Sequence, residues 1–259
     1  MSSCIVLDVV DFLQGSLSLI YVIISFIIGF SIISKFGKIK DRLYILVGIF
    51  WLMLSTLWLP EAISFLMSVF IQNTLATEWY FIIGNVFIPI AVIAWIIAYT
   101  DMISKDKQNL ALILMLIFSI IFEVLFFYHF FLDINLIGVI DPLRPFSADF
   151  GYFLTVLILI AILVIFFTGL NFARKSLSSE NKEVRLKGKL LQVAFITFTI
   201  AALLEKTVRS ILIGTIFTDP TIPILSVMLV VVRLLLIIST LAFYGGFLLP
   251  RWMKAIFKK

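Results

Sequence analysis

Six ionisable side chains lie inside segments that otherwise read as membrane-spanning helices, and they are the residues best suited to binding or proton chemistry. They are three acids and three bases: Glu61, Glu123, Glu205, Lys206, Arg209 and Arg233. A charge near the centre of a bilayer costs roughly 2.5–3.5 kcal/mol even on the lenient insertion scales. Each charge therefore needs a partner or a use, and the set as a whole could neutralise itself.

The segments that carry these charges identify the fold class. Of the 259 residues, 63% are hydrophobic and 14% are charged, and the mean hydropathy is +1.20. A soluble domain is about 45–50% apolar and about 25% charged. Several apolar runs exceed the roughly 20 residues that cross a bilayer as a helix. We therefore expect an all-α membrane protein of one domain with seven transmembrane helices, approximately 16–34, 43–70, 79–100, 110–132, 150–172, 190–217 and 222–249, followed by an interfacial basic tail at 250–259.

The basic residues predict the orientation. The connections after the first, third and fifth spans, together with the tail, hold 16 of the 20 Lys and Arg residues, whereas the opposite side holds only Arg144. By the positive-inside rule the N-terminus lies outside and the C-terminus is cytoplasmic. The basic rim predicts contact with anionic lipid headgroups at the cytoplasmic face. No feature indicates nucleic-acid binding.

Counting at 1.5 Å per residue from the polar ends of each span places the six charges at one depth, between the midplane and roughly 8 Å toward the outside. Because they come from the second, fourth, sixth and seventh spans, we expect those four helices to surround a shared polar interior. Glu205 and Arg209 stand four residues apart and can pair on one helix face. Lys206 and Arg233 are then available to Glu61 and Glu123.

Weaker features surround this layer. Asn85 and His129 could line the mouth of a cavity that opens outward. The loop at 133–149 contains two prolines, which predict a short ordered cap rather than a helix. One cysteine and one histidine argue against a thiolate zinc site or a His-rich metal centre. We find no catalytic motif and predict no cofactor, no metal and no enzymatic activity.

The end of the last span carries one resemblance. The run Phe243-Tyr-Gly-Gly-Phe-Leu-Leu-Pro-Arg-Trp-Met-Lys254 resembles the exit from the seven-helix N-terminal sensor region of prokaryotic histidine kinases. That resemblance implies an outward-facing sensing module in a prokaryotic plasma membrane, whose last helices pass a signal to a cytoplasmic partner. The chain departs from the family pattern because no kinase, PAS or GAF region follows.

Three functions fit the charged layer. The first is a stand-alone sensor or receptor-like module with an outward-opening polar pocket that signals through the sixth and seventh spans. The second is a secondary transporter or a proton or ion channel that uses the charges as a relay. The third is a non-catalytic subunit of a membrane complex, in which buried ion pairs fix the helix register.

Overall fold

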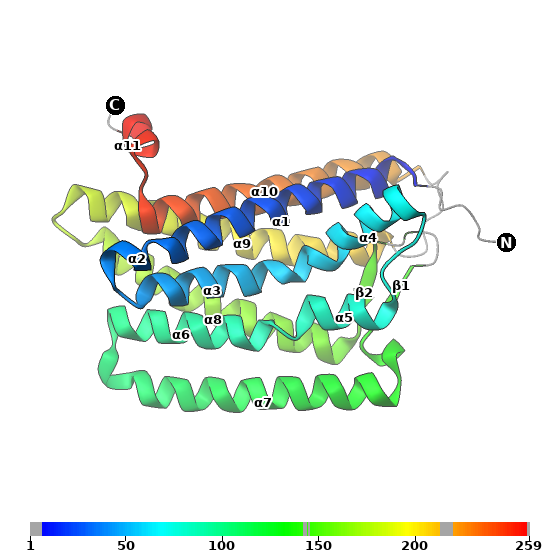
Figure 1. Ribbon diagram of the computed structural model, residues 1–259, viewed down its shortest axis with the longest axis horizontal. Helices are drawn as coiled ribbons and strands as arrows, with labels where there is room; N and C mark the ends of the chain where they lie inside the picture. The colour runs from blue at the N-terminus through cyan, green and yellow to red at the C-terminus, as the bar shows by residue number, and fades with distance from the viewer. Residues whose placement is uncertain (1–6, 142–143, 145, 213–219, 258–259) are drawn as a thin grey trace.

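The computed structural model describes residues 7–141, 144, 146–212 and 220–257, and these residues form a helical bundle with a small hairpin at one end (Figure 1). Seven helical segments are long and apolar enough to cross a membrane. The end of the bundle that carries the hairpin and the start of the first helix is here called the cap end. The opposite end, which carries the last helix, is here called the tail end. The elements are α1 (Val9–Ser34), α2 (Phe36–Ile39), α3 (Leu43–Ser55), η1 (Thr56–Trp58), α4 (Leu59–Ile71), α5 (Thr77–Asn85), α6 (Ile88–Ile103), η2 (Lys105–Lys107), α7 (Gln108–Leu132), η3 (Ile134–Leu136), β1 (Gly138–Ile140), β2 (Ala148–Phe150), α8 (Tyr152–Leu177), α9 (Lys182–Leu212), α10 (Ile222–Leu248) and α11 (Arg251–Phe257).

All seven predicted spans coincide with helical segments, but α1 begins seven residues and α9 eight residues before the predicted start. Residues 213–217 of the sixth span lie outside the described residues. Two spans are interrupted rather than continuous. The second breaks at η1 directly before Pro60, and the third breaks between α5 and α6 directly before Pro89. Proline lacks the amide proton of an interior helix bond and clashes with the preceding turn, so a helix restarts at the proline.

Six of the spans form a closed ring. Around the ring each helix contacts the next in the order α1, α10, α9, α8, α6 and α3, and α3 contacts α1 again. Helix α4 also contacts α1. The fourth span, α7, lies outside this ring and packs mainly against α6 (Figure 1). The expectation that this span borders a shared polar interior is therefore wrong. The first span takes that place beside α4 and α10.

An aromatic cluster fills the middle of the ring. The rings of Trp51 and Phe243 stack with centroids 4.1 Å apart, and Phe50 lies 4.9 Å from Trp95. The indole of Trp95 donates a 2.8 Å hydrogen bond to Thr168 Oγ1, which links α6 to α8. Large aromatic side chains bury much apolar area each, so this cluster fixes the relative positions of α3, α6, α8 and α10.

The cap end is ordered by polar contacts between α1 and the loop before α8. Asp8 and Asp11 form a reciprocal cap that starts α1 at Val9, two turns earlier than the apolar run alone predicts. Arg144 is fully buried and reaches both carboxylates, at 3.0 and 3.3 Å. Strands β1 and β2 pair antiparallel beside it. An ordered cap was predicted from Pro142 and Pro145, and these two residues lie outside the described residues.

Candidate functional site

Four of the six predicted charges meet in one place and form a closed network of two acids and two bases. This four-charge network consists of Glu61, Glu205, Arg209 and Arg233. Each arginine contacts both carboxylates: Arg209 pairs with Glu61 and Glu205, and Arg233 pairs with the same two acids. The Arg233 Nη2–Glu61 Oε2 and Arg209 Nε–Glu205 Oε1 distances are 2.8 and 2.9 Å. The network is charge-neutral.

Three elements position the network. The break at η1 makes Glu61 a first-turn residue of α4, where the positive end of the helix dipole favours a carboxylate. Glu205 and Arg209 lie on α9 in the predicted pair four residues apart, and the 2.9 Å contact between them is present. Arg233 comes from α10. The first span adds Ser18, whose hydroxyl oxygen lies 2.6 Å from Glu61 Oε2 and can donate to it.

The network is buried but not completely satisfied. The side chains of Glu61 and Arg233 are 0% exposed, and those of Arg209 and Glu205 are 6% and 12% exposed. Arg209 Nη1 and Arg233 Nε make no hydrogen bond with any residue that the structure describes. An unpaired donor in an apolar interior costs about 1–3 kcal/mol, more when it is charged. The network therefore has arginine N–H donors without an acceptor, whereas both of its carboxylates are paired with arginines.

Lys206 lies outside the network. It was predicted to pair with Glu61 or Glu123, but its ammonium pairs with Asp149 of β2 and lies 3.3 Å from the Phe150 carbonyl. The physical reason is that the hairpin brings β2 against α9 and supplies an acid closer than those on α4 or α7. Both partners are more than one third exposed, so solvent or ligand can reach this pair.

The remaining predicted residues are scattered. Glu123 is half-buried on α7, and its Oε2 has no hydrogen-bond partner among the described residues. Asn85 is buried on α5, where its side-chain amide donates to the Phe81 carbonyl at 2.9 Å. His129 lies on α7 with Nδ1 2.7 Å from the Leu125 carbonyl, and its ring stacks on Phe153. Helix α7 lies outside the ring, so Glu123 cannot join the network.

A pocket of about 190 Å³ lies beside the network, on the cap-end half of the bundle. Neither Asn85 nor His129 lines it. Its walls are mostly apolar and come from η1, β2, α8 and α9; the lining residues are Leu57, Trp58, Ala148, Phe150, Thr155, Ile158, Leu159, Ile162, Ala202, Leu203, Glu205, Lys206 and Arg209. Three charged side chains of α9 therefore border a space that sequence reasoning did not locate.

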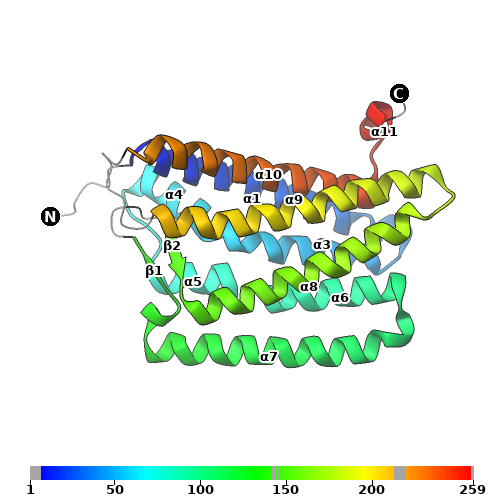
Figure 2. The same ribbon diagram turned by 180° about the vertical axis from the view of Figure 1, so that it is seen from behind.

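The pocket exists because α8 and α9 separate toward the cap end. Near the tail end they touch closely: a Cβ on Gly169 would lie only 2.5 Å from the Phe195 ring. From there the two helices diverge toward β2 (Figure 2). Apolar side chains of moderate size on α8 and Ala202 on α9 do not fill the resulting wedge.

No family model, curated protein or solved structure matches this chain. Its function must therefore be inferred from the geometry. Among the residues that the structure describes, no three His, Cys, Asp or Glu side chains are grouped so that they could hold a metal ion.

Proposed function

We propose that this chain is a receptor-like sensor module of a prokaryotic plasma membrane, with the cap end outside and the tail end in the cytoplasm. One observation carries the proposal: the pocket between α8 and α9 shares Glu205 and Arg209 with a buried network that also holds α4 and α10. The orientation is supported by the basic residues, which gather in the connections and the helix of the tail end.

A ligand can change the network only if it binds two states of the network with different affinities. Lys206 and Arg209 offer that route because both border the pocket and both are engaged by acids, Asp149 and Glu205 in particular. A ligand that accepts hydrogen bonds from these cations competes with the acids. Loss of the α9 contacts would leave α9 free to shift relative to α4 and α10.

A shift of α9 has a direct path to the tail end through α10 and α11. Ser239 donates to the Ala194 carbonyl at 2.9 Å, and Lys187 donates to the Phe247 carbonyl at 3.2 Å. Beyond the end of α10, Lys254 of α11 pairs with Glu183 of α9. These contacts tie the two helices together from the network to the C-terminal helix, where a cytoplasmic partner would read the change.

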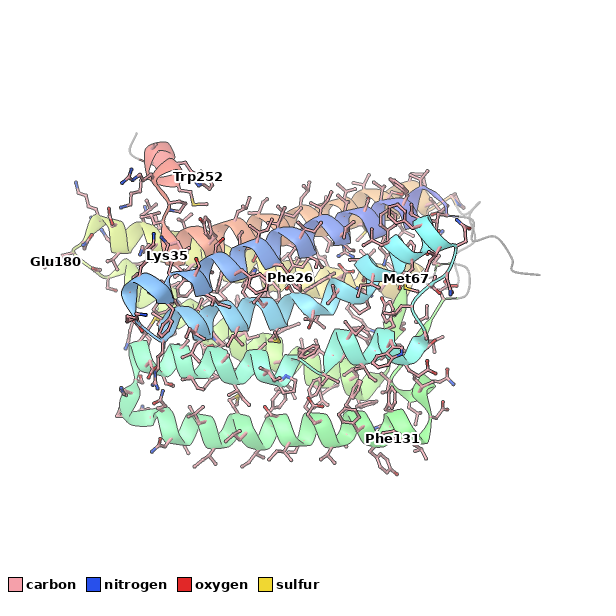
Figure 3. All side chains as sticks on the ribbon, viewed as in Figure 1. Phe26, Lys35, Met67, Phe131, Glu180 and Trp252 are labelled. Atoms are coloured by element: carbon pink, nitrogen blue, oxygen red, sulfur yellow. The ribbon has the colours of Figure 1, made fainter. Side chains whose placement is uncertain are left out.

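The test is a distance measurement between spin labels that replace Glu180 and Trp252, in a Cys4→Ser background in lipid nanodiscs. Both sites are exposed at the tail end and are labelled in Figure 3. Glu205→Gln weakens the network from the pocket side, so we expect it to shift the distance distribution measured by double electron–electron resonance. Asp101→Asn breaks the exposed Arg42–Asp101 pair, which touches neither the pocket nor the network, and serves as the matched control.

The competing functions give different outcomes. An unchanged distance in Glu205→Gln, together with a lower thermal stability, would mean that the network is a register clamp. Proton or ion flux in proteoliposomes that Glu205→Gln abolishes would mean that the chain is a transporter or channel. A sensor shows the distance change and no flux.

A further inference from the structure

We propose that the pocket between α8 and α9 binds a single-chain anionic amphiphile that enters sideways from the surrounding hydrocarbon. This inference rests on the proposed function and names its ligand class. It follows from three properties of the pocket: where it opens, what its walls are made of, and which hydrogen-bonding groups remain unused at its charged end.

The opening lies on the flank of the bundle. Leu159 of α8 and Leu203 of α9 line the pocket, and they are 38% and 45% exposed on the surface that faces the membrane. A ligand that reaches the pocket between these leucines must pass through hydrocarbon. This route selects molecules that already partition into the bilayer.

The walls fit an alkyl chain that lies along the helices. The lining residues of α8 extend from Thr155 to Ile162, and those of α9 from Ala202 to Arg209, which is roughly 10 Å along each helix at 1.5 Å per residue. The volume of about 190 Å³ is comparable to an apolar cavity of about 150 Å³ that accepts benzene. The space is therefore large enough for part of one alkyl chain and too small for two chains side by side.

The charged end has more unused donors than unused acceptors. Both oxygens of Glu205 already accept from the two arginines of the network. An ammonium has three donors, and Lys206 uses two of them on Asp149 and Phe150. Arg209 Nη1 is buried and unpartnered among the described residues. The free capacity is thus one N–H of Lys206 and those of Arg209 Nη1, which select a carboxylate or phosphate headgroup.

The pocket contains a reporter, since Trp58 lines it. Bromine quenches indole fluorescence on close contact, so 11-bromoundecanoate titrated into nanodiscs should quench Trp58 saturably, at one ligand per protein. Trp58→Phe should remove that saturable component. The neutral 11-bromoundecanol should bind at least about tenfold more weakly, because charge-assisted hydrogen bonds are about twice as strong as neutral ones. Undecyl phosphate as a competitor distinguishes a phosphate preference from a carboxylate preference.

Two pairs of variants complete the test. Lys206→Gln should weaken binding of the acid about tenfold without affecting the alcohol, whereas Lys107→Gln at the tail end should change neither. Ala202→Phe fills the pocket and should abolish saturable quenching, whereas Ile200→Phe on the exposed face of α9 should not. Equal quenching by a brominated two-chain phosphatidylcholine that Ala202→Phe also abolishes would show that the space holds ordinary bilayer lipid and would overturn the inference.

The two proposals fail separately. Saturable binding of bromoundecanoate without a change in the Glu180–Trp252 distance would retain the ligand class and overturn the sensor. A distance change in Glu205→Gln without saturable binding of the acid would retain the sensor and overturn this ligand.

Discussion

Removal of Arg233 should destabilise the fold strongly, because the remaining three residues of the four-charge network then carry an uncompensated negative charge. In Arg233→Met the carboxylates of Glu61 and Glu205 remain, 0% and 12% exposed, and share the single cation Arg209. Removal of one partner of a buried ion pair costs about 3–5 kcal/mol, since the other charge is left uncompensated. We expect a loss of that size in the free energy of unfolding.

The same reasoning predicts partial rescue by a second substitution. Arg233→Met combined with Glu205→Gln leaves Glu61 and Arg209, which are again neutral, so the double variant should recover about 1–3 kcal/mol relative to additive losses. Unfolding titrations with dodecyl sulfate in maltoside micelles, followed by tryptophan fluorescence, give these free energies. The exposed Arg185→Met is the matched control and should stay within about 0.5 kcal/mol of wild type.

A loss below about 1 kcal/mol in Arg233→Met would contradict this account. So would strict additivity in the double variant, because additivity is the behaviour of independent sites and these side chains are in contact.

Three further outcomes test the packing and the cap. Gly151→Ala should disrupt the packing of the cap, since a Cβ there would lie 2.0 Å from a backbone carbonyl oxygen of η3. We expect proteolysis of the 133–149 loop to become faster. Trp95→Phe should cost about 1–3 kcal/mol in unfolding titrations, because it removes the 2.8 Å hydrogen bond to Thr168 and leaves a cavity where the fully buried indole was. Burial opposes ionisation of Asp8, but a backbone amide one turn on and the guanidinium of Arg144 lower its pKa below the ordinary 3.8. A lowered pKa stabilises the cap at higher pH, and this stabilisation is lost as the pH falls below about 4; Asp8→Asn should remove that pH dependence of loop proteolysis.

The sequence predicted the spans well because each apolar run ends in polar residues that cannot enter the membrane. It also predicted that the charges of the second, sixth and seventh spans would meet, since their depths agree. It could not place α7, because the surface of this helix is uniformly apolar and a residue that faces lipid looks the same as one that faces protein. In the most apolar stretch of this span, only 17% of the residues are buried. The same ambiguity led to the wrong expectation for Glu123.

Two other features depend on contacts between distant segments. The partner of Lys206 is Asp149, and the pairing forms because the β1–β2 hairpin turns back toward α9. Depth counting treats the loop as lying outside the membrane and therefore does not consider its acids. The pocket depends on the angle between α8 and α9, which the close contact at Gly169 sets near the tail end. A one-dimensional pattern contains no information about that angle.

The most direct test of the central claim measures the distance between spin labels at Glu180 and Trp252 while the pocket is filled. We predict that saturating undecanoate shifts the distance distribution in wild type and has no effect in Ala202→Phe, where the pocket is occupied by the new side chain. A distribution that stays unchanged in wild type, at concentrations where quenching of Trp58 shows the pocket to be full, would contradict the claim that pocket and network form one sensing unit.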